Sequence, residues 1–168
     1  MTGRHDTEAG ATARDEREAL LMRAGGLAFA VYADECEGLT PWAEPAPLPH
    51  APACVLGVVS VRGRMRTVLD PARLFETLGH GPSPRPEKYA HVASLAGDEQ
   101  LALASETAAR LTLDSRDLGP APDDANLPAR ATFSNAGETV YLLDPSRLFD
   151  AAMTGTERRR RRTVNREP

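Results

Sequence analysis

Cysteine, aromatic residues and long apolar runs are all scarce in this chain. Two cysteines, Cys36 and Cys54, occur among 168 residues. That is too few for the disulfide framework of a small secreted domain, so we expect two reduced thiols. No apolar run approaches the length of about 20 residues that crosses a bilayer. The polar start, MTGRHDTEAGATARDERE, does not look like a signal peptide. These absences predict a cytoplasmic protein without a membrane span.

Patterns typical of catalysis and metal binding are also missing. The four histidines are dispersed, and no pair has the spacing of metal ligands. Ser60 lies between Val59 and Val61 and lacks the glycine-flanked elbow of a hydrolase nucleophile. The chain contains no P-loop or other nucleotide-binding motif. We therefore expect neither an enzyme nor a bound metal or cofactor.

Charge is distributed unevenly along the chain. The net charge is −4 overall, with −2 in residues 1–19 and +4 in residues 157–168, which leaves −6 for the middle. An acidic middle argues against a nucleic-acid-binding core. Residues 1–19 are predicted to form a disordered arm, and residues 154–168 a basic tail. The run Arg158–Arg162 is either a solvated tail, which we favour, or a contact for nucleic acid, anionic lipid or an acidic partner.

One stretch of the chain occurs twice, 74 positions apart. Residues 63–75 read GRMRTVLDPARLF, and residues 137–149 read GETVYLLDPSRLF. The same offset aligns LAFA at residues 27–30 with LALA at residues 101–104. A repeat of this length predicts a domain built from one unit used twice.

Each copy of the repeat predicts a turn, a strand and a short helix. Gly63 suits a tight turn, because glycine adopts positive φ without steric cost. The apolar and β-branched residues that follow predict a strand. Asp70 and Pro71 then suit the N-cap and first position of a helix. Leu-Phe closes each copy and is expected to anchor its helix in the core. The second copy carries the corresponding residues Gly137, Asp144, Pro145, Leu148 and Phe149.

The remaining sequence is dominated by short apolar segments separated by turns. Hairpins are expected over residues 20–32 and 130–143, and buried strands over residues 54–61, 89–95 and 99–104. One helical turn is expected at residues 33–37, a second at residues 105–109, and a short strand at residues 111–113. Residues 41–52 hold five prolines and should run extended. Residues 79–87 form a glycine- and proline-rich joint. Many short strands with little helix predict an all-β barrel or paired barrels.

The run VLGVVSVRGRMRTVLDPARLF resembles the signature of the CheW-like domain family. Its Leu-Gly-Val-Val-Ser-Val-Arg-Gly segment, residues 56–63, and the following strand, Asp and helix match the family pattern. The similarity covers about residues 20–150. It implies a CheW-like domain over residues 20–153, made of two five-stranded SH3-like barrels that share a core. The subdomains are expected near residues 20–79 and 87–153, with exchange of strands between them left open.

The resemblance also implies a role. Stand-alone members of the family are non-enzymatic adaptors that couple chemoreceptors to the histidine kinase CheA in bacterial signalling arrays. The implied partners are the signalling tip of a receptor and the matching CheW-like domain of CheA. The alternative is a diverged CheW-like module in another regulatory system, whose arginine-rich tail contacts nucleic acid or anionic membrane.

Arg62 is the strongest candidate for partner binding. Its counterpart in the repeat is Ala136, so the turn does not need this charge to fold. A guanidinium makes several hydrogen bonds across an interface, and the resemblance implies receptor binding at this position. The other interpretation is an ordinary exposed turn arginine. Two further candidates belong to this group. Gly63 lies in the same turn, and Glu37 lies in a segment that resembles an acidic junction of the family.

The strand before the turn supplies three further candidates. Gly57 allows either the close approach of a partner or a bulge in the strand. Val58 and Val61 are assigned to the core, whereas Val59 and Ser60 are candidates to face a partner. Trp42, the only tryptophan, either covers the end of a barrel, which we favour, or forms an exposed anchor for a partner.

Overall fold

The computed structural model describes residues 15–124 and 126–153. Most of the expected N-terminal arm and the run Arg158–Arg162 therefore lie outside the described residues. The first strand, β1, begins at Glu16, four residues before the expected start of the ordered domain. Three of those four residues are charged, and all four are held by pairing with a strand near residue 114. The placing of residues 16–19 in a disordered arm is therefore wrong.

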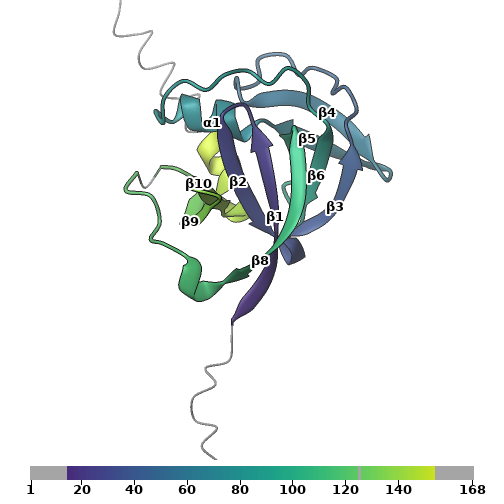
Figure 1. Ribbon diagram of the computed structural model, residues 1–168. Helices are drawn as coiled ribbons and strands as arrows, with labels where there is room; N and C mark the ends of the chain where they lie inside the picture. Colours follow the sequence, from purple (N-terminus) through teal and green to yellow (C-terminus); the bar gives the residue numbers. More distant parts are fainter. Residues whose placement is uncertain (1–14, 125, 154–168) are drawn as a thin grey trace, which may run out of the picture.

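Ten strands and short helical segments make up the described chain (Figure 1). The first half holds β1 (Glu16–Ala24), β2 (Leu27–Tyr32), β3 (Cys36–Pro41), β4 (Val55–Val61), β5 (Arg64–Leu69), the 3-10 turn η1 (Ala33–Glu35) and helix α1 (Pro71–Thr77). The second half holds β6 (His91–Leu95), β7 (Leu101–Ser105), β8 (Thr107–Asp114), η2 (Ser115–Asp117), β9 (Ala129–Asn135) and β10 (Glu138–Leu143). Residues 145–153 are also helical. The strand-rich class expected from the sequence is confirmed.

The strands form two five-stranded sheets that exchange strands between the halves of the chain. One sheet has the order β3-β6-β7-β5-β4 and is called barrel I; the other has the order β8-β1-β2-β10-β9 and is called barrel II. In each sheet, the second and third strands in this order come from one half of the sequence and the other three strands come from the other half. The exchanged hairpins join their hosts by parallel pairing, β7 with β5 and β2 with β10. This interlocking leaves the two halves of the sequence inseparable.

The sequence repeat is a repeat of structure. Strands β9 and β10 begin and end 74 positions after β4 and β5. The helix over residues 145–153 begins 74 positions after α1, again one residue past an aspartate. Strand β5 of barrel I and strand β10 of barrel II are therefore counterparts. Side chains that differ between these two strands reflect something other than the demands of the fold.

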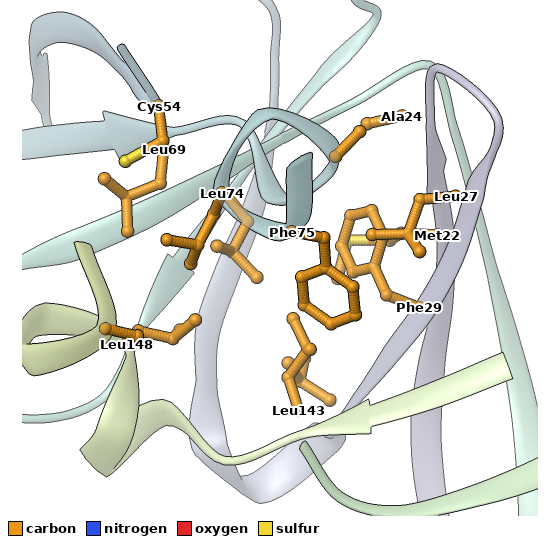
Figure 2. Close-up of a cluster of buried hydrophobic side chains, with 14 of the residues drawn as sticks. Met22, Ala24, Leu27, Phe29, Cys54, Leu69, Leu74, Phe75, Leu143 and Leu148 are labelled. Carbon is orange, nitrogen blue, oxygen red and sulfur yellow. The ribbon is translucent and has the colours of Figure 1, made fainter. Parts of the chain in front are cut away.

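Three hydrophobic clusters show how the barrels are joined. One cluster lies inside barrel I and includes Val59, Val68 and Val92. A second lies inside barrel II and includes Phe133 and Leu142. The third and largest draws side chains from both sheets and from both helices. Figure 2 shows this shared cluster closing around Leu74 and Phe75 of α1. Two five-stranded barrels around a common core, as expected, are confirmed.

Helix α1 is fixed by its N-cap. The fully buried carboxylate of Asp70 accepts hydrogen bonds from the backbone amides of Ala72 (2.9 Å) and Arg73 (3.2 Å), which satisfies two otherwise unpaired donors of the first turn. The other carboxylate oxygen of Asp70 accepts a hydrogen bond from the Tyr89 hydroxyl. The cap thereby ties the helix to the chain entering β6.

The two Leu-Phe anchors differ. Leu74, Phe75 and Leu148 are completely buried, whereas Phe149 is 48% exposed. The expectation that Phe149 pins its helix to the core is therefore wrong. The C-terminal helix is held by Leu148, Ala151 and Ala152, a stripe with helical spacing, and it turns Phe149 outward.

Strand β3 was not expected from the sequence, and of β8 only residues 111–113 were expected. Strand β3 has an alternating pattern of half-buried and exposed residues and contains a glycine and a proline, both of which weaken a strand signal. Strand β8 begins at Thr107, inside the expected helical turn at residues 105–109, because β1 pairs with it along its whole length. Both are edge strands, specified by their neighbours more than by their own residues.

Candidate partner-binding site

The turn between β4 and β5 presents Arg62 to solvent. Arg62 and Gly63 have φ of 51° and 78°, the pair of positive values that defines a type I′ hairpin turn. Val61 and Arg64 pair on either side of it. Arg62, Gly63 and the neighbouring Ser60 are all exposed. Three of the predicted site residues therefore share one accessible hairpin tip.

A cavity of about 310 Å³ lies between this tip and strand β3. Its wall is formed mainly by polar side chains of β3, β5 and β6 and by the hairpin turn: Glu37, Gly38, Thr40, Val61, Arg62, Arg64, Arg66 and Ser94. The Arg62 guanidinium lies 3.7 Å from where a Cβ on Gly38 would stand. The small residue at position 38 thus leaves room for Arg62 to lie over β3, and the structure brings Glu37 and Arg62 to one cavity.

The most buried charge of the cavity is Arg66. Its side chain is 4% exposed, and its Nη1 donates a hydrogen bond to the carbonyl of Leu95 (3.0 Å). Its Nη2 donates to the carboxylate of Glu37, which is 41% exposed. Glu37 therefore has a structural task, since a buried guanidinium without a counter-charge is costly.

Arg66 was missed by sequence reasoning, although the repeat contained a signal for it. The residue 74 positions later is Val140, a core residue of barrel II. An arginine whose counterpart in a duplicated strand is buried and apolar is not explained by the fold. The same comparison sets Arg64 against Glu138 and Arg62 against Ala136.

Gly57 is explained by contacts within the chain. It is buried with φ of 143°, and a Cβ there would lie 2.3 Å from the carbonyl oxygen of Ala46. The amide and carbonyl of the next residue, Val58, both bond to Ala46 at 2.9 Å. The strand register shifts between Val55 and Gly57, which marks a bulge. Of the two interpretations of Gly57, the structure favours the bulge.

Val59 points into barrel I and is 5% exposed. The expectation that it faces outward beside Ser60 is wrong, because neighbouring residues of a strand point to opposite faces. Val58, assigned to the core, is only half-buried. Val61 packs against the barrel I cluster, as expected.

An exposed methionine adds an apolar contact to the hairpin. Met65 is 57% exposed and pairs across the hairpin with Ser60. Methionine adapts its shape to irregular surfaces, and an apolar side chain beside an arginine is a common composition for the centre of an interface. Sequence reasoning missed Met65 because it lies within the repeat strand.

Trp42 is half-buried. Its ring packs against Tyr89 with centroids 4.7 Å apart, at the edge of the barrel I cluster. Of the two interpretations, covering a barrel end is the one that fits.

A second exposed surface lies at the other end of the same hairpin. A cavity of about 330 Å³ separates the proline-rich segment from the C-terminal helix, and Val55 and Leu69 form its floor. Leu48, Phe149 and Met153 on its rim are 45–48% exposed. We call this surface the apolar groove. The six residues of β5 place it about 20 Å from the hairpin tip.

The described part of the chain has neither a cluster of metal-ligating side chains nor a membrane-spanning helix. Within residues 15–124 and 126–153, no three His, Cys, Asp or Glu side chains gather as a metal site would require. In that same part of the chain, no helix is long and apolar enough to cross a membrane.

Comparison with protein families decides where the chain belongs. The model of the CheW-like domain matches residues 18–153, which include all of barrel I and all but the first two residues of barrel II. The chain belongs to the CheW-like domain family.

Individual members of the CheW-like family are distant from this chain. A curated relative, chemotaxis protein CheW of Rhizobium meliloti (strain 1021), is 28% identical over 140 residues, covering 79% of this chain and 87% of the relative. The crystal structure of the scaffolding protein TtCheW from Thermoanaerobacter tengcongensis superposes with a TM-score of 0.61 at 11% identity, covering 76% of this chain and 88% of that one. At such identity the superposition supports the CheW-like fold alone.

Proposed function

We propose that this CheW-like domain is a non-enzymatic adaptor that couples chemoreceptors to the histidine kinase CheA. The curated relative is a chemotaxis protein, which supports a role of this kind. Coupling requires one chain to hold two partners at once. The hairpin tip and the apolar groove lie at opposite ends of one rigid hairpin and meet that requirement.

One observation carries the proposal. The type I′ turn occurs twice with the same backbone, and only the copy at Arg62 bears a charge. An exposed arginine that the turn does not need, flanked by exposed Met65, is suited to recognition. We assign the hairpin tip to the receptor's signalling tip and the apolar groove to the CheW-like domain of the kinase. The other proposed contributors to the receptor-binding surface are Glu37, which pairs with Arg66, and Ser60 and Gly63 of the hairpin.

Isothermal titration of the full chain with each partner tests the assignment. Arg62→Ala is expected to weaken binding of a receptor signalling-tip fragment at least about tenfold, about 1.4 kcal/mol, and to leave binding of the CheA domain unchanged. Phe149→Ser is expected to weaken binding of the CheA domain and to leave binding of the receptor fragment unchanged. Arg110→Ala is the matched control, because Arg110 is 83% exposed on β8, away from both surfaces. If neither partner binds at tens of micromolar, the proposal fails.

A further inference from the structure

The cavity beneath the hairpin tip contains buried polar atoms without partners. Arg66 and Ser94 are each 3% exposed, and both line the cavity. Among the described residues, neither Arg66 Nε nor Ser94 Oγ has a hydrogen-bond partner. A buried donor left without a partner costs folding free energy. Both atoms belong to residues that line one cavity, which makes this cavity a candidate for a bound polar group.

The charge of the cavity indicates what is missing. Three arginines, Arg62, Arg64 and Arg66, line the cavity together with one acidic residue, Glu37. This local excess of positive charge lies in a region of the chain, residues 20–156, whose net charge is −6. An excess of arginine around one cavity favours an anionic oxygen ligand.

The duplicated fold shows how the equivalent end of barrel II is completed. At the start of β10, Glu138 accepts hydrogen bonds from Arg23 of β1, one of them at 2.8 Å. In barrel I the counterpart of Glu138 is Arg64, at the start of β5. Barrel II therefore has an acid at this position, whereas barrel I has a base. Barrel I thus has no acidic side chain at the position where barrel II has Glu138.

We propose that the cavity lined by Arg64, Arg66 and Ser94 binds a carboxylate from an acidic side chain of a partner protein. The planar Glu37 carboxylate already sits against Arg66, so a group of this shape fits the guanidinium there. The cavity volume of about 310 Å³ admits a whole side chain as well as its carboxylate. The identity of the partner rests on the proposed function; the ligand chemistry of the cavity does not.

Propionate, which is a glutamate side chain without its backbone, is a probe that needs no partner. Amide NMR of the full chain during titration is expected to show saturable shifts at Glu37, Gly38 and Ser94. Propionamide, the neutral analogue, and sodium chloride at matched ionic strength are expected to produce no such shifts. Shifts that do not saturate, or that chloride reproduces, would overturn the proposal.

Variants then separate binding from folding. Arg64→Glu gives barrel I the acid of barrel II and is expected to abolish propionate binding with an unchanged or higher melting temperature. Arg110→Glu makes the same charge change on β8 and is expected to leave binding within about twofold. Ser94→Ala is expected to weaken propionate binding about tenfold without lowering stability. Ser105→Ala removes another buried hydroxyl without a partner, outside the cavity, and should not affect binding.

The receptor fragment distinguishes this inference from the proposed function. If the fragment binds through Arg62 while propionate does not bind and Ser94→Ala changes nothing, the carboxylate site is wrong and the adaptor stands. If propionate binds while neither the fragment nor the CheA domain does, the site stands and the adaptor proposal fails. Binding of the fragment that Arg64→Glu and Ser94→Ala both weaken supports the two together.

Discussion

Arg62 and Ala136 occupy the same position of the same turn in two copies of one hairpin. Their φ angles are 51° and 49°, and the glycines that follow have φ of 78° and 77°. A residue other than glycine pays a steric cost at positive φ, so neither side chain is there because the backbone prefers it. Alanine satisfies the fold at one copy; the arginine at the other is available for recognition.

Replacing Arg62 by asparagine is expected to stabilise the protein. Asn-Gly is a favoured pair for a type I′ turn, and asparagine tolerates positive φ better than arginine does. The free energy of unfolding in urea should rise by about 0.5 kcal/mol. Ala136→Asn is the matched control and should behave alike. A loss above about 1 kcal/mol for Arg62→Asn alone would show that Arg62 holds the fold.

Gly57→Ala is expected to destabilise the domain strongly. The added Cβ would lie 2.3 Å from the Ala46 carbonyl oxygen in a backbone conformation that L-residues avoid, so the bulge or its neighbour must move. We expect a loss of at least about 2 kcal/mol in chemical denaturation. Gly79 also has positive φ, at 97°, but a Cβ there meets nothing within 4 Å. Gly79→Ala should cost less, and equal losses would mean that the close approach to Ala46 is unimportant.

The two helix caps, Asp70 and Asp144, are expected to contribute unequally to the free energy of unfolding. Asp70 is completely buried, caps α1 and accepts from Tyr89, so Asp70→Ala leaves several buried donors unpaired. We expect a cost of about 3 kcal/mol. Asp144 accepts from the Ser146 amide at 3.1 Å in a more exposed setting, so Asp144→Ala should cost about 1 kcal/mol. Thermal and urea unfolding of both variants check the order, and the reverse order would contradict it.

The two thiols should react at different rates in the folded protein. Burial raises the pKa of the Cys54 thiol to about 11, so roughly one molecule in a thousand carries the thiolate at pH 8. Burial also raises the pKa of Cys36, which is less enclosed. Mass spectrometry after iodoacetamide treatment should find Cys36 modified at least about tenfold faster.

The pH dependence of that reaction has a definite sign. The thiolate is the reacting form, and its fraction at Cys54 rises as pH approaches the pKa of about 11. Alkylation of Cys54 should therefore accelerate between pH 8 and 10. The raised pKa also favours folding at neutral pH, and this contribution to stability is lost as pH rises toward 11. In urea the two thiols should react alike, and equal rates in the folded protein would show that Cys54 is not enclosed.

The features predicted correctly from the sequence are those specified locally. Gly63, Asp70 and Pro71 predict a turn, an N-cap and a helix start through their own backbone chemistry. The repeat then predicts the same three features in the second half of the chain. The first residues of β8 could not be found in this way, because their pairing with β1 keeps them extended. The exchange of hairpins between barrels is likewise a long-range arrangement.

The candidate site was predicted in part for the same reason. Arg62 was identified from the mismatch with Ala136, and the same comparison, carried along β5, would have identified Arg64 and Arg66. Val59 was misassigned because strand parity has to be fixed by a neighbour, and here the bulge at Gly57 against Ala46 fixes it. Met65 and Phe149 are ordinary apolar residues whose exposure only the packed structure reveals.

The central claim is that this chain couples a receptor to a kinase through the Arg62 hairpin. Its most direct test is the autophosphorylation rate of CheA reconstituted with receptor-containing membranes, measured with and without the full chain. We predict stimulation of at least about tenfold by the natural sequence, and a much smaller effect of Arg62→Ala at the same concentration, with Arg110→Ala unimpaired. No stimulation at any concentration, or full stimulation by Arg62→Ala, would contradict the claim.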